Sequence, residues 1–119
     1  MRLADLIEKI RQHPDYHNVG MILCHNGVVR KTSRDGRAVS GLRISVNHEK
    51  LNKILDENKQ KPGIIDIKLY IAANQDLKVG DDVMFLVVAG DIRENVISCL
   101  QDTLNAIKIH ATHKTQFYL

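Results

Sequence analysis

The sequence predicts an α+β fold, a two-layer arrangement in which helices pack on an antiparallel or mixed sheet. Three observations support this prediction. Apolar residues recur at helical spacing in residues 3–11, 48–61 and 92–108. Between these segments lie shorter apolar or alternating stretches that have the length of strands. Helices and strands intermix without the strict alternation of a parallel α/β protein, which is typical of the α+β class.

Size and composition indicate one globular domain spanning residues 1–119. The contents of 44% hydrophobic and 26% charged residues are ordinary for a soluble protein with one core. No apolar stretch approaches the roughly 20 residues needed to span a bilayer, so no membrane segment is expected. Asp5 and Glu8 interrupt the apolar pattern at the N-terminus, which argues against a signal peptide. Cys24 and Cys99 are expected to be buried, reduced thiols of a cytoplasmic protein.

The first half of the chain is expected to hold one helix and two strands. Residues 3–11 form the helix, which a proline-containing turn ends. The first strand covers residues 18–30 and is interrupted by the turn-prone pair Asn26-Gly27. After a polar loop with the hairpin signal Asp35-Gly36, residues 39–46 form the second strand.

The second half is expected to supply the centre of the sheet. Pro62-Gly63 ends the second helix, and the alternating residues 64–73 then form a half-buried strand. Residues 83–89 are almost continuously apolar, which is typical of a strand covered on both faces. The last helix covers residues 92–108, and a short strand at 112–119 follows it.

Basic residues gather between two of the expected strands, with Asp35 as the single acidic residue among them. Such a cluster attracts phosphate or carboxylate groups. Arg30 ends an apolar strand, so its guanidinium is expected to be held in place and to bind an anion. Three members are instead expected at a solvated hairpin tip: Lys31, Arg34 and Arg37. The cluster ends at Arg43.

The last helix carries a cation near each end. Arg93 lies in its first turn, where free N–H groups and the helix dipole favour an anion, so the arginine needs an anionic partner. Asp91, Glu94 or a bound anion fits that requirement. Lys108 lies at the far end, where the helix dipole favours a cation, so a structural role explains it as well as a catalytic one.

No metal centre or cofactor is expected. His110 and His113 would lie on opposite faces of a strand, and no carboxylate or thiolate completes a ligand set. The other histidines lie in or near turns and are expected to face solvent: His13, His17, His25 and His48. No catalytic triad or phosphate-binding glycine loop is visible.

An ordered set of motifs over residues 20–114 resembles the catalytic (large) subunit of molybdopterin synthase. Each motif is short, but their order along the chain is fairly specific. The matching residues are Gly27-x-x-Arg30, Gly36, Val39-x-Gly41-Leu42, Lys61-x-Gly63-Ile64, Leu77-x-Val79-Gly80-Asp81, Ala89-Gly90-x-x-Arg93, and Lys108 with Lys114 six residues on.

The resemblance implies an α/β hammerhead fold and a sulfur-transfer reaction. A small ubiquitin-like sulfur-carrier subunit would insert its Gly-Gly C-terminus, carried as a thiocarboxylate, into a pocket of this chain. Sulfur would pass to cyclic pyranopterin monophosphate, giving molybdopterin. By the same resemblance Lys108 is the main catalytic residue, Lys114 assists it, and Arg30 and Arg93 hold the substrate.

The resemblance also implies a homodimer within a heterotetramer. Arg93 and Lys108 are 15 positions apart, which corresponds to roughly 22 Å along one helix. One substrate cannot easily contact both residues of a single chain. We therefore expect Arg93 of one copy to face Arg30 and Lys108 of a second copy.

The sequence departs from the family pattern at three places, and these departures leave a second hypothesis open. Ile92 replaces the histidine that usually precedes the arginine, and Ala72-Ala73 replaces a His-Arg pair. Residues 112–116 lack the usual tryptophan. A non-catalytic relative that keeps the fold and the partner groove fits these losses. Nucleic-acid binding through residues 30–43 is disfavoured, because aromatic residues are few and the net charge is only +3.

Overall fold

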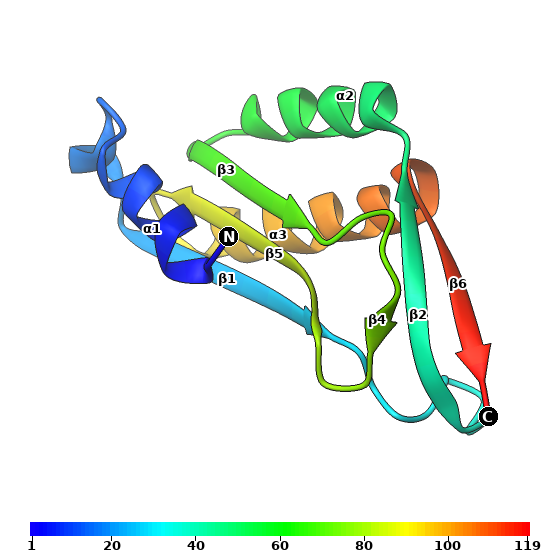
Figure 1. The fold of residues 1–119 in the computed structure, drawn as a ribbon. Coiled ribbons are helices and arrows are strands. Elements are labelled where there is room, and N and C mark those ends of the chain that lie inside the picture. The colour runs from blue at the N-terminus through cyan, green and yellow to red at the C-terminus, as the bar shows by residue number, and fades with distance from the viewer.

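The computed structural model describes residues 1–119 and confirms the α+β class (Figure 1). Three α-helices and six strands are joined by one 3₁₀ turn, η1, and one π-helical turn, η2. In chain order the elements are α1 (Leu3–Arg11), η1 (Tyr16–Asn18), β1 (Met21–Val28), β2 (Val39–Val46), α2 (His48–Lys59), β3 (Ile64–Ile71), β4 (Leu77–Lys78), β5 (Asp82–Gly90), α3 (Arg93–Ala106), η2 (Ile107–Ala111) and β6 (Thr112–Tyr118).

The strands form two separate three-stranded sheets, and every pairing is antiparallel. The first sheet has the order β1-β5-β3, with β5 in the centre, as its apolar composition predicts. The second has the order β4-β2-β6 and lies beside the first near the C-terminus (Figure 1). The expected single sheet is thus divided in two.

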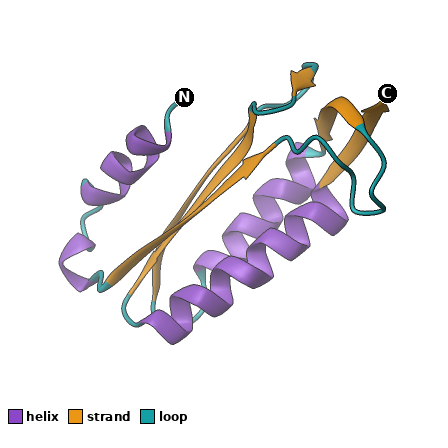
Figure 2. Cartoon of the chain, turned by 90° about the horizontal axis from the view of Figure 1, so that it is seen from below, coloured by secondary structure: helices purple, strands orange, loops and turns teal.

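The central strand β5 is buried on both faces, which explains its continuous apolar sequence. Leu86 and Val88 pack in one core cluster with residues of α2 and α3. Phe85 and Val87 point the other way and pack against α1. Figure 2 shows the first sheet between α1 on one side and the two long helices on the other. The buried side chains of β5 from Met84 to Ala89 thus lie between helices on both faces of the sheet.

A third core cluster joins the two sheets. Leu42 and Ile44 of β2 pack there with Val29, Ala72 and Leu77. Gly41 lies so close to the carbonyl oxygen of Leu77 that a Cβ atom would overlap it. Glycine at this position thus allows β2 and β4 to pair. The junction of the sheets is a packed interface and not a loose connection.

Three local expectations are wrong. Asn26-Gly27 does not interrupt the first strand, because both residues pair with β5. Cys24 is exposed, since it alternates outward on β1, whereas Cys99 is buried as expected. His110 lies in the π turn η2 and not in a strand, because the last helix ends in a widened turn.

Strand β3 differs from the expected alternation at one position. Asp66 is buried although the pattern places it on the polar face. The Lys68 amine lies 3.3 Å from one carboxylate oxygen, and the Lys59 amine lies 3.8 Å from the other. Two cations thus compensate the buried carboxylate.

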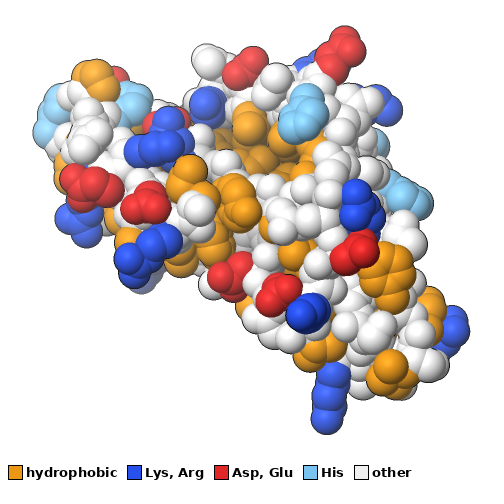
Figure 3. Space-filling view, in the orientation of Figure 1, with side chains coloured by type: hydrophobic (Ala, Val, Ile, Leu, Met, Phe, Trp, Pro, Cys, Tyr) orange, Lys and Arg blue, Asp and Glu red, His pale blue; other side chains and the backbone are white.

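An apolar hollow lies on the face shown in Figure 3, below α2 and beside β3. Its walls include Leu51 and Leu55 of α2 and Leu69 of β3.

None of the helices combines the length and apolar composition of a membrane-crossing segment.

Candidate functional site

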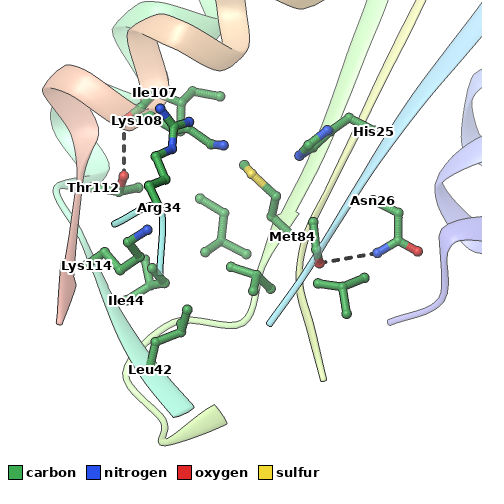
Figure 4. A pocket seen from close by; sticks show the side chains of 14 residues that line it. His25, Asn26, Arg34, Leu42, Ile44, Met84, Ile107, Lys108, Thr112 and Lys114 are labelled. Atoms are coloured by element: carbon green, nitrogen blue, oxygen red, sulfur yellow. Dashed lines mark hydrogen bonds between the residues drawn. The ribbon is translucent and has the colours of Figure 1, made fainter. Parts of the chain in front are cut away.

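A cavity of about 540 Å³ opens at the junction of the two sheets. Strands β1 and β5 of the first sheet form one wall, and β2 and β6 of the second form the other. The π turn η2 closes one end, and Arg34 of the loop at residues 29–38 lies near Lys108 at that end (Figure 4). The lining residues are His25, Asn26, Gly27, Val28, Arg34, Leu42, Ile44, Ile71, Val83, Met84, Ile107, Lys108, Thr112 and Lys114.

Three cations line this cavity, and no carboxylate does. Arg34, Lys108 and Lys114 approach it from the loop, the π turn and β6 (Figure 4). None of the three forms an ion pair, and none forms a side-chain hydrogen bond. The remaining lining is largely apolar. Unpaired cations above apolar walls suit an anionic ligand with an apolar or aromatic body.

The π turn determines where the Lys108 side chain points. Ile107 and Ala111 at its two ends are buried, and the Thr112 hydroxyl donates to the Ile107 carbonyl at 3.2 Å. The residues between them face outward or toward the cavity. Ile109 is 72% exposed, whereas Lys108 points into the cavity (Figure 4). A widened turn, a frequent feature of functional sites, thus directs the amine to the pocket.

The surroundings of Lys108 make its amine easier to deprotonate than that of a lysine in water. Partial burial is the main cause that lowers the pKa of this lysine, and the positive charges of Arg34 and Lys114 lower it further. A lower pKa leaves a larger neutral fraction at a given pH. The neutral amine can accept a proton or act as a nucleophile, and the ammonium form can donate a proton.

Lys108 is therefore expected to react faster with an amine-directed reagent than an exposed lysine outside the pocket. Each unit by which its pKa lies lower raises the neutral fraction about tenfold. The measurement is peptide mapping after brief labelling with trinitrobenzenesulfonate at mildly alkaline pH. Lys50, exposed on α2, is the internal reference. Equal labelling of the two lysines would contradict a lowered pKa of Lys108.

His25 lies across the cavity from Lys108, on β1 (Figure 4). Its Nε2 atom is buried without a hydrogen-bond partner, and no other side-chain nitrogen or oxygen atom in the chain is. Burial lowers the pKa of His25, and the charge of Lys108 lowers it further. An unsatisfied buried polar group costs about 1–3 kcal/mol. The expectation that His25 faces solvent is therefore wrong.

The structure brings together two of the four expected site residues. Lys108 and Lys114 line one cavity. Arg30 does not line it; its Nε donates to the Thr32 carbonyl at 2.8 Å. Arg93 is exposed at the opposite end of α3, where its Nε lies 3.3 Å from the Glu94 carboxylate. A single chain therefore does not gather all four residues.

Arg34 lines the cavity, although the sequence predicts a solvated hairpin tip for it. The tip curls back because Ser33 is buried and its backbone bonds to Arg37, while Gly36 takes a positive φ of 85°. A bridge between Thr32 and Ala38 closes the turn. The Asp35-Gly36 signal did predict a tight turn, but nothing local indicates which way Arg34 points.

No group of three or more His, Cys, Asp or Glu side chains lies close enough together to hold a metal ion. The chemistry of the cavity thus rests on its amines, its guanidinium and its imidazole. The fold is of the α+β class, and these groups give its cavity a positive lining.

The chain belongs to the MoaE family, because the family model described as MoaE protein matches residues 2–110. No curated protein matches the chain, but several solved structures share its fold. Molybdopterin synthase from Staphylococcus aureus is 20% identical with a TM-score of 0.73, covering 91% of this chain and 85% of that one. Molybdopterin cofactor biosynthesis protein E from Burkholderia multivorans is 20% identical with a TM-score of 0.77, covering 100% and 84%.

A third structure contains two kinds of subunit. It is described as a protein–protein complex of subunits 1 and 2 of the molybdopterin-converting factor from Helicobacter pylori. Its match has 19% identity and a TM-score of 0.72, and covers 99% of this chain and 84% of that one. At these identities the three structures establish the fold.

Proposed function

We propose that the chain transfers sulfur from a thiocarboxylated small partner protein to cyclic pyranopterin monophosphate. This reaction makes molybdopterin in molybdenum cofactor biosynthesis. The observation that carries the proposal is the cavity with three unpaired cations, one of them Lys108. Membership of the MoaE family supports the same role.

The charges and walls of the cavity suit both proposed ligands. Arg34 and Lys114 attract the phosphate of the substrate, and the apolar wall formed by Ile44, Val83 and Met84 accommodates the ring system. The partner's Gly-Gly tail is narrow enough to enter the same opening and ends in an anionic thiocarboxylate. Lys108 lies where the two ligands meet and acts in proton transfer or covalent attachment.

Arg30 and Arg93 serve the substrate from positions outside the cavity lining. Arg30 borders the loop that carries Arg34, so its guanidinium extends the positive field around the opening. Arg93 reaches the site from a second copy of the chain across a two-fold interface. The active assembly is a homodimer with two partner subunits, a heterotetramer in which each site combines residues of two copies.

A single-turnover assay tests the proposal directly. The full chain is mixed with the thiocarboxylated partner and the cyclic precursor, and molybdopterin is measured after conversion to a fluorescent derivative. We expect product that depends on all three components. Partner binding without product would contradict the proposed enzymatic activity and favour the non-catalytic alternative. The specific observation for that alternative is the exposed Ile92 in place of histidine.

Arg34→Ala is expected to weaken binding of the phosphorylated precursor about ten- to a hundredfold. This range corresponds to the loss of one charge-assisted contact, roughly 1.5–3 kcal/mol. Titration calorimetry measures the affinity, and Lys31→Ala is the matched control because Lys31 lies on the same loop outside the cavity lining. Equal losses for Arg34→Ala and Lys31→Ala would mean that only the general charge of the loop matters.

Arg30→Ala should weaken binding of the precursor more than binding of the partner.

A further inference from the structure

His25 is a polar residue of the cavity that the proposed reaction does not use, and it is the one whose side chain has a buried atom without a hydrogen-bond partner. It lies on β1 and faces a cavity that also contains three cations. Its buried Nε2 has no partner within the chain. An apolar side chain would fill the same place without leaving a polar atom unpaired. The position of the imidazole in the wall of an anion-binding cavity therefore indicates a partner that comes with the ligand.

Only a flexible side chain separates Nε2 from the cavity. Gly27, two residues along β1, has no side chain beside the ring, and a Cβ there would lie 3.4 Å from Nε2. The same point is 3.5 Å from Cγ of Met84. In Figure 4 the Met84 side chain lies between His25 and Lys108. Methionine is flexible and unbranched, so a modest rotamer change opens Nε2 to the cavity.

The charges around His25 favour its protonation only when an anion is present. The cavity presents Arg34, Lys108 and Lys114, all positive, and each opposes a further positive charge on the ring. Three carboxylates lie on β5 and α3, which pack against β1, and each is paired with another residue. Asp82 on β5 accepts from Asn26 at 3.0 Å, and Asp102 on α3 accepts from Lys61 at 2.8 Å. At the start of α3, Glu94 is paired with Arg93. A bound anion is thus the group that can make protonation of His25 favourable.

We propose that His25 is a ligand-binding residue that takes up a proton when an oxyanion enters the cavity and then donates a hydrogen bond to that oxyanion from Nε2. The inference rests on the proposed function for the anionic nature of the ligand. The proton comes from solvent, and no covalent bond changes. Binding at this site is therefore coupled to proton uptake through one histidine.

The pH dependence of anion binding follows from the pKa of His25 in the free protein and in the anion-bound protein. In the free protein burial and Lys108 lower the pKa of His25, so the ring is largely neutral near pH 7. A hydrogen-bonded anion raises that pKa. Affinity for the anion therefore increases as the pH falls from the pKa of the bound state toward that of the free state, and then levels off.

The test uses sulfate, because its charge is constant across the relevant range. The pKa of His25 is measured in the full chain by NMR between about pH 5 and pH 7.5, with and without saturating sulfate. We expect sulfate to raise the His25 pKa by about one unit or more, the usual effect of a close opposite charge. His110, exposed on η2 outside the cavity lining, serves as the internal reference.

A variant provides the second arm. In His25→Gln, sulfate affinity should lose most of the increase that the wild-type chain shows at lower pH, whereas His110→Gln should keep it. An unchanged His25 pKa at saturating sulfate, or a full pH dependence in folded His25→Gln, would overturn the proposal. The NMR measurement on the wild-type chain decides the matter even if the variant does not fold. Sulfate-linked protonation without any sulfur transfer would instead refute the proposed reaction alone.

Discussion

Replacing Lys108 by alanine is expected to reduce sulfur transfer about 100- to 10 000-fold, the usual contribution of a positioned proton-transfer group. The amine is the cavity cation whose pKa the surroundings lower, first through burial and then through Arg34 and Lys114. The fold should persist, because Lys108 forms no ion pair that the substitution would remove and alanine is compatible with a helical turn. Single-turnover product formation measures the effect, and circular dichroism verifies the fold.

Two controls make this result specific. Lys50→Ala removes an exposed lysine from α2 and should leave the rate unchanged. Lys114→Ala removes a second cavity cation and should reduce the rate less, because Lys114 assists and does not carry the main step. If Lys108→Ala is folded and forms product at the parental rate, Lys108 serves only as a cation at the end of a helix.

Mixing two inactive variants, Arg93→Ala and Lys108→Ala, is expected to restore activity. If each site combines Arg93 of one copy with Lys108 of the other, a mixed dimer contains one intact site and one doubly altered site. Random reassortment makes half of the dimers mixed, so about a quarter of all sites recover. The measurement is sulfur transfer after subunit exchange, compared with each variant alone.

This second prediction needs proof that exchange occurs. Copies of the chain with different mass tags, followed by native mass spectrometry, show whether mixed dimers form. A chain that is monomeric in solution contradicts the composite site. Mixed dimers without recovered activity contradict it equally, and would leave Arg93 as the exposed partner of Glu94 that the single chain contains.

The fold was predictable where the sequence pattern depends on local burial. The continuous apolar stretch at residues 83–89 indicated a central strand because both faces of β5 are covered. The division into two sheets was not predictable, because β2 pairs with β6 about 70 residues away and no local signal specifies that partner. The predicted interruption of the first strand at Asn26-Gly27 was also wrong because of a distant partner. Pairing with β5 overrides the turn preference of that dipeptide.

The site was less predictable than the fold. Lys108 and Lys114 were found through the resemblance to the family, and they do line one cavity. Arg34 and His25 were not, because their roles depend on the direction of a side chain and not on residue type. The loop turn directs Arg34 toward the cavity, and the strand alternation that exposes Cys24 turns its neighbour His25 toward the cavity.

The π turn at Ile107–Ala111 also bears on how this segment can change during evolution. Its outward positions, Ile109 and His110, are exposed, so substitutions there are expected to cost little stability. The length of the π turn is constrained, because removing one residue would rotate the chain that follows by about 100°. The same deletion would shift β6 by one residue against β2 and turn Lys114 to the other face. Selection should therefore permit substitutions here while rejecting insertions and deletions.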